Sequence, residues 1–231
     1  MIKWSDYVDA IYCLHFLPYK DKKEYIEKEL KRVGIADSGI LKYHYTFPSK
    51  FDKFILDRLR YNKKIIPDHI VPRATNVGLA HYSIYQEALG LGYKRIFIVE
   101  DDVAFLKDVD RIKDILDHAP SDWDFLKLDK TRCPQFEDRL KTIIPGPYFG
   151  SNYTGGYWAL GFCGVSNNAF PIGIGSLEHE IMVCDQIFEN RDLRDFSKIK
   201  RYVSNTSLVR QLGDKYNWSY EGLINPDDYN M

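Results

Sequence analysis

The sequence predicts an α/β fold with a mostly parallel central sheet, on three observations. Strand-like and helix-like segments alternate along the chain, which is typical of parallel strands joined by helices. The run 96–99 is continuously apolar, as in a strand that helices bury on both faces. The chain has 231 residues, 45% hydrophobic and 28% charged, which is enough apolar side chain for the core of one domain.

The first elements are a strand and a helix. The run 7–16 is β-prone and contains neither glycine nor proline, so it predicts a strand. The charged stretch from Lys20 to Arg32 repeats apolar residues at helical spacing and is followed by Gly34, a typical helix stop. The next segments predict, in order, a strand at 40–45, a helix at about 51–60 and an irregular connection at 62–76.

The central elements lead to an acidic cluster. Residues 77–89 form an apolar helix face that ends at Gly90 and Gly92. The strand at 95–99 follows and runs directly into three carboxylates. Beyond them the sequence predicts a helix around 109–116, a short strand at 125–128 and an irregular stretch to Pro147.

Charge and hydropathy exclude several classes of protein. The 32 basic and 33 acidic side chains give a net charge of -1, so we expect no nucleic-acid partner. The N-terminal residues build no apolar signal-peptide segment, and no run approaches the ~18 apolar residues of a transmembrane helix. We therefore expect a cytoplasmic protein with no transmembrane segment.

The carboxylates Glu100, Asp101 and Asp102 predict a metal site. Ligands in open α/β sheets bind beyond the carboxyl ends of the strands, which is where these three side chains follow the buried strand. If the strand stayed extended, Glu100 and Asp102 would share one face and Asp101 the other. Oxygen ligands of this kind suit Mg²⁺ or Mn²⁺, which could bridge them to phosphate. The alternative is a solvated acidic turn that caps the next helix.

Basic side chains and one histidine are further candidates. Lys22 and Lys23 follow the first strand, where they could meet a nucleotide, although a solvated helix face is the alternative. His81 lies on the helix before the acidic strand and is either a site residue or a packing residue. The chain lacks the paired histidines of a helical zinc site, a serine-hydrolase elbow and a Gly-Lys-Ser/Thr phosphate loop.

The chain contains the segment from Gly78 to Leu89, then Gly92-Tyr93, then residues 95–103, which end in Glu-Asp-Asp-Val. Together these stretches resemble glycosyltransferase family 25. That family contains galactosyltransferases of lipopolysaccharide biosynthesis. The resemblance implies a GT-A type fold, a nucleotide-sugar donor such as a UDP-sugar, a divalent metal (Mn²⁺ or Mg²⁺) and an inverting transfer to a saccharide hydroxyl. It also implies a saccharide or glycolipid acceptor in bacterial lipopolysaccharide, lipooligosaccharide or capsule synthesis, and peripheral association with the cytoplasmic face of the inner membrane.

The resemblance assigns roles to individual residues. Asp102 would be the principal metal ligand, with Asp101 or Glu100 assisting. The donor and cofactor contacts would be His81, Glu100 and Asp101, together with Lys22 and Lys23, which are candidates from their position after the first strand and stand where the family has an arginine-rich segment. The general base would be Asp185, which lies in the otherwise apolar segment 181–188 and is separate from the metal motif. Glu178 and Glu180 are the competing carboxylates.

We expect one glycosyltransferase domain over 1–231. Its donor-binding half would span about 1–130, its acceptor-side half about 131–215, and residues 225–231 would be a loose tail. Two other classes remain open: a metal-dependent phosphohydrolase that uses the same acidic strand end, and a non-catalytic module that binds saccharide by aromatic stacking.

Overall fold

The computed structural model describes residues 2–16, 20–46, 71–129, 146–151, 161–179 and 198–212. In this part of the chain the central sheet has seven strands, in the order β2-β1-β3-β7-β5-β8-β6. Their bounds are β1 Ala10–Phe16, β2 Leu41–Thr46, β3 Arg95–Glu100, β5 Phe125–Lys127, β6 Phe149–Ser151, β7 Phe162–Ser166 and β8 Arg201–Ser204.

Most strands of this sheet point the same way. β1 pairs in parallel with β2 and β3, and β5 pairs in parallel with β8. β7 lies between β3 and β5 and is antiparallel to both, and β6 is antiparallel to β8. Strands β1, β2, β3, β5 and β8 therefore share one direction, which confirms the predicted α/β class with a mostly parallel sheet.

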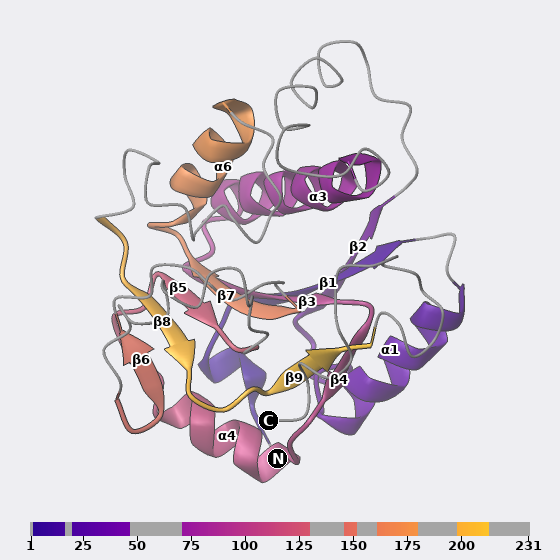
Figure 1. Ribbon diagram of the computed structural model, residues 1–231, viewed down its shortest axis with the longest axis vertical. Coiled ribbons are helices and arrows are strands. Elements are labelled where there is room, and N and C mark those ends of the chain that lie inside the picture. The colour runs from indigo at the N-terminus through magenta and orange to yellow at the C-terminus, as the bar shows by residue number, and fades with distance from the viewer. Residues whose placement is uncertain are drawn as a thin grey trace.

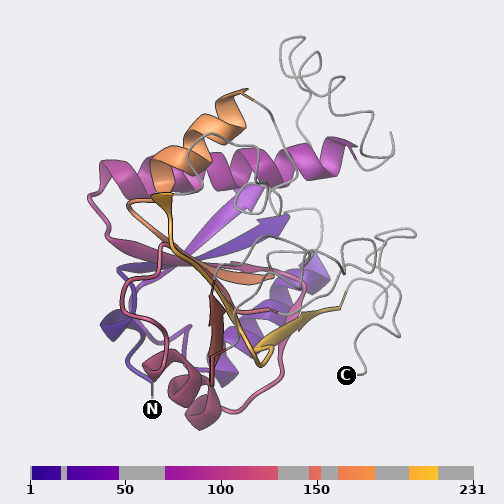
Figure 2. The same ribbon diagram turned by 60° about the vertical axis from the view of Figure 1, so that its left-hand side comes forward.

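Helices cover both faces of the sheet (Figures 1 and 2). Helices α3 (Val71–Gly90) and α6 (Phe170–His179) cover one face, while η1 (Trp4–Asp6), α1 (Lys20–Arg32) and α4 (Val109–Asp117) cover the other. Side chains of β3 alternate between the two cores: Ile96 and Ile98 pack with α3, whereas Phe97 and Val99 pack with α1 and α4. This double burial explains the continuous apolar run of the strand.

A second, two-stranded sheet follows β3 immediately. Strand β4 (Val103–Phe105) pairs antiparallel with β9 (Val209–Gln211), so Val103 lies opposite Gln211. Neither strand is among the sequence predictions. Because β4 begins one residue after Asp102, the acidic residues occupy the junction of the two sheets.

Most predicted elements within the described residues are confirmed. Helix α1 has the predicted bounds, and Gly34 after it has a φ of 75°. The predicted irregular connection is wrong over 71–76, because α3 already begins at Val71. Pro72 stands in its first turn, where the N–H that proline lacks has no helical partner in any case.

The predicted helix at 51–60 and the apolar segment 181–188 lie outside the described residues. None of the helices in the described ranges is long and apolar enough to cross a membrane.

Candidate active site

The acidic residues form a turn at which the chain leaves the main sheet. β3 ends at Glu100, Asp101 and Asp102 make the turn, and β4 starts at Val103. The backbone N–H of Leu212, which follows β9, donates to the carbonyl of Asp102 over 2.7 Å. The alternation of side chains along the strand therefore stops at Glu100. We predicted that Asp101 and Asp102 point to opposite faces, and this prediction is wrong, because both carboxylates reach the same cation.

That cation is the ammonium group of Lys22, on the third residue of α1. Its Nζ lies 3.5 Å from Oδ1 of Asp101 and 3.5 Å from Oδ2 of Asp102. Lys22 and Asp102 are each 1% exposed, and Asp101 is 6% exposed. Charges buried to this degree lose most of their hydration, so they persist only when they are paired. The structure thus brings the predicted site residues Lys22, Asp101 and Asp102 together.

A histidine from β1 completes this cluster. Nδ1 of His15 lies 2.8 Å from Oδ2 of Asp101, and the His15 side chain is buried. β1 and β3 are parallel neighbours with Leu14 opposite Glu100, so their carboxyl ends meet at the same edge of the sheet. Sequence reasoning missed His15 because its position depends on which strands are neighbours, which the order of elements along the chain does not give.

Glu100 has a separate set of contacts. Its Oε2 accepts a hydrogen bond from Nε2 of Gln211 on β9, and its backbone N–H donates to the carbonyl of Gly161 over 3.0 Å. A Cβ atom on Gly161 would lie 3.0 Å from Cγ1 of Val103 and 3.2 Å from Oδ2 of Asp129. A larger residue at this position would therefore require Val103 or Asp129 to shift by a few tenths of an ångström.

A buried ion pair lies next to this contact. Nζ of Lys127, on β5, is 2.9 Å from Oδ1 of Asp129, and both side chains are at most 1% exposed. Oδ2 of Asp129 also accepts the N–H of Gly161 over 2.7 Å. Burial raises the pKa of Asp129, and the ammonium of Lys127 opposes that rise. Sequence reasoning missed this pair because a charged residue in a three-residue strand has no hydrophobic pattern that marks it as buried.

His81 and Lys23 lie apart from this cluster. His81 is fully buried on α3, across the sheet from α1, and its Nδ1 lies 2.9 Å from the hydroxyl of Tyr85. Burial lowers the pKa of His81 to about 3, with a smaller contribution from His44. Lys23 is half-buried; its Nζ lies 3.9 Å from Oε1 of Glu27 and 5.6 Å from the centroid of the Tyr45 ring.

Within the described residues, the contacts of His81 and Lys23 do not include the three carboxylates. Asp185 and Glu180 lie outside the described residues.

The acidic turn has the ligand chemistry of a magnesium or manganese site. Such ions bind proteins through one or two carboxylates and take their other oxygen ligands from water and substrate phosphates. Asp101 and Asp102 supply two such carboxylates, and the ammonium of Lys22 already stands between them as a cation. Within the described residues, no group of three or more histidine, cysteine, aspartate or glutamate side chains could hold a metal. Asp101 and Asp102 therefore fit an ion shared with a phosphate-bearing ligand.

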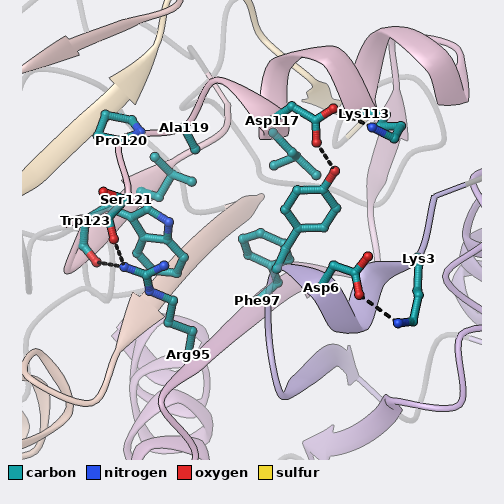
Figure 3. A pocket seen from close by; sticks show the side chains of 13 residues that line it. Lys3, Asp6, Arg95, Phe97, Lys113, Asp117, Ala119, Pro120, Ser121 and Trp123 are labelled. Atoms are coloured by element: carbon teal, nitrogen blue, oxygen red, sulfur yellow. Dashed lines mark hydrogen bonds and ion pairs between the residues drawn. The ribbon is translucent and has the colours of Figure 1, made fainter.

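A pocket of about 470 Å³ lies at the opposite edge of the sheet (Figure 3). It is lined by residues that precede β1, by α4 and the residues that follow it, and by side chains of β3 and β5, and it contains none of the predicted site residues. Charged side chains that line the pocket contact other residues of the pocket. Lys3 pairs with Asp6 at 3.0 Å, and the guanidinium of Arg95 lies 4.4 Å from the centroid of the Trp123 ring. Because ligands of α/β sheets bind at the carboxyl ends of the strands, the acidic turn and not this pocket is the candidate active site.

The acidic turn lies inside a segment of the chain that matches a known protein family. Residues 78–146 match glycosyltransferase family 25 (LPS biosynthesis protein). Procollagen galactosyltransferase 2 from Homo sapiens is 24% identical to this chain over 155 residues, which cover 58% of this chain and 24% of that protein. The chain thus spans about a quarter of the length of this curated relative.

Solved structures of glycosyltransferases are similar to this chain at low identity. A glycosyltransferase involved in the glycosylation of the major capsid of PBCV-1 is 15% identical, with a TM-score of 0.44 over 84% of this chain and 80% of that one. Mouse xyloside xylosyltransferase 1 is 9% identical, with a TM-score of 0.38 over 78% of this chain and 80% of that one. The family match over residues 78–146 confirms the resemblance to glycosyltransferase family 25 and supports the predicted enzyme class, a glycosyltransferase.

Proposed function

We propose that this protein transfers a hexose from a nucleotide-sugar donor to a hydroxyl group of a saccharide. One observation carries the proposal: the carboxylates Asp101 and Asp102 stand together around a buried cation at the carboxyl end of β3, within the residues that match family 25. A cation-binding pair of carboxylates at a strand end suits a donor whose leaving group is a diphosphate.

The chain's own side chains have distinct tasks in this proposal. Asp102 and Asp101 bind the cation that accompanies the diphosphate, and His15 holds Asp101 in place through its 2.8 Å contact. A bound divalent cation neutralises charge that develops on the departing diphosphate. Glu100 is turned toward Gln211 and fixes β9 against the acidic turn. Lys23 and His81 remain proposed donor contacts.

The donor and acceptor follow from the family and from the relative's name. The family description names lipopolysaccharide biosynthesis, and the human relative is named a galactosyltransferase. We propose UDP-galactose as the first donor to test, and an acceptor in bacterial lipopolysaccharide, lipooligosaccharide or capsule. A glycolipid acceptor would bring the protein to the cytoplasmic face of the inner membrane.

An inverting transfer requires a base on the face of the sugar opposite the leaving diphosphate, and we propose Asp185 for this role. Asp185→Asn preserves the shape of the side chain and removes its ability to accept a proton. We expect the variant to bind the donor normally and to lose about 100-fold or more in kcat. Near-normal transfer at saturating donor and acceptor would exclude Asp185 and direct the search to Glu178 and Glu180.

The proposed function is tested by a thermal-shift screen of nucleotide sugars with Mn²⁺. A ligand that binds the folded state raises the melting temperature, by an amount that grows with its concentration relative to Kd. We expect one nucleotide sugar to raise the melting temperature in the presence of Mn²⁺ and to do so less when EDTA is added. If no nucleotide sugar stabilises the protein under either condition, a donor-dependent transferase is excluded. Phosphate release from free nucleotides without an acceptor would instead support the phosphohydrolase alternative.

A further inference from the structure

Lys22 occupies the position in which a metal ion would meet the acidic turn. Its Nζ is 3.5 Å from one carboxylate oxygen of Asp101 and 3.5 Å from one of Asp102, so the two carboxylates share a single ammonium group. Oδ2 of Asp101 is also within 2.8 Å of Nδ1 of His15. The acidic turn is thus balanced by the chain's own basic groups.

We propose that Lys22 is a built-in counter-ion that competes with a divalent cation for Asp101 and Asp102. The inference rests on the proposed function in one respect, namely that this turn is where a cation acts. A divalent cation held by both carboxylates would stand close to the Lys22 ammonium, and like charges at such separations repel strongly in a buried site. The lysine must therefore move before the ion can bind both carboxylates.

The position of Lys22 makes such a displacement feasible. The ammonium stands at the end of a flexible four-carbon stem, and it contacts each carboxylate at 3.5 Å, longer than the 2.7–2.9 Å typical of a strong charged hydrogen bond. Lys22 lies in the first turn of α1, at the edge of the sheet where a donor would bind. The affinity of the donor-free protein for the metal is consequently low, because moving the lysine costs part of the binding free energy.

The test is the affinity of the donor-free protein for Mn²⁺ alone, measured from the electron paramagnetic resonance signal of free Mn²⁺. Lys22→Met removes the charge and retains a side chain of similar length. We expect Lys22→Met to bind Mn²⁺ at least about tenfold more tightly than the wild type, a change of about 1.4 kcal/mol. Lys28→Met is the matched control: it removes the same charge from an exposed residue of the same helix, and its affinity should equal that of the wild type.

Equal or weaker Mn²⁺ binding by Lys22→Met would overturn the proposal, as would an equal gain in Lys28→Met. Removal of Lys22 leaves two buried carboxylates without their lysine, so the variant can lose stability. In that case the melting temperature is measured with and without Mn²⁺, and a rise larger in Lys22→Met than in the wild type supports the proposal. A variant that Mn²⁺ does not stabilise more than the wild type contradicts it. Neither measurement uses a donor or an acceptor, so failure to detect sugar transfer would affect the proposed function alone.

Discussion

Lys22 and Lys23 are neighbours in the sequence and have opposite environments in the structure. Successive residues of a helix point about 100° apart, so one lysine turns toward the acidic strand end and the other toward water. The sequence around them alternates acidic and basic residues, which fits either a solvated helix face or a nucleotide contact. Composition and periodicity could place both on a helix, but only the packing of α1 beside the acidic turn distinguishes the buried lysine from the half-buried one.

The burial of His81 predicts how the free energy of unfolding depends on pH. Burial lowers its pKa from 6.5 to about 3, so between these values the unfolded chain binds a proton that the folded protein does not. The free energy of unfolding should therefore fall as the pH drops below about 6.5, by up to about 1.4 kcal/mol per pH unit from this group. His81→Gln cannot titrate and should flatten this part of the pH profile.

The measurement is urea unfolding of wild type and His81→Gln between about pH 7 and about pH 4. His118→Gln is the control, because His118 is exposed and lies stacked on Tyr148. If the free energy of unfolding of His81→Gln falls with pH as steeply as that of the wild type, His81 is not the buried neutral group that the structure shows.

At the scale of elements, the sequence predicts those with strong periodicity or clear stop signals. α1 and β3 follow from apolar spacing and a buried apolar run, and both are present. The antiparallel insertion of β7 and the short strands β4 and β9 could not be predicted in this way. Strands of three to five residues carry too little pattern, and their pairing partners are far away in the sequence.

The end of α1 tests the role of one of these stop signals. Gly34 has a φ of 75°, in the left-handed region, and a Cβ there would have its nearest neighbour, Nε1 of Trp4, at 3.9 Å. Gly34→Ala should therefore destabilise the protein through backbone strain and not through a clash, by about 1–2 kcal/mol in urea unfolding. Gly90→Ala is the control, because Gly90 is the last residue of α3 and an added Cβ meets nothing within 4 Å. Equal stability of the two variants would contradict this role for Gly34.

At the scale of the whole molecule, the candidate site is assembled from segments far apart in the chain. His15 comes from β1, Lys22 from α1, the acidic turn from the end of β3, and Gln211 from β9 (Figure 1). The sequence identifies the acidic motif because its three members are consecutive. It does not identify His15 or Gln211, because their contacts depend on strand order and on the second sheet. The division into a donor-binding half and an acceptor-side half stays a prediction.

The central claim is that the acidic turn binds the donor of a glycosyl transfer through a divalent cation. Its most direct test is the affinity for the nucleotide sugar found in the thermal-shift screen, measured by calorimetry with Mn²⁺ for Asp102→Asn. The control is Asp114→Asn, which removes a half-buried carboxylate of α4 that pairs with Arg111. We expect Asp102→Asn to bind the donor at least about tenfold more weakly and to lose its dependence on Mn²⁺, while Asp114→Asn binds as the wild type does. Donor affinity and Mn²⁺ dependence that are unchanged in a folded Asp102→Asn variant would contradict the account.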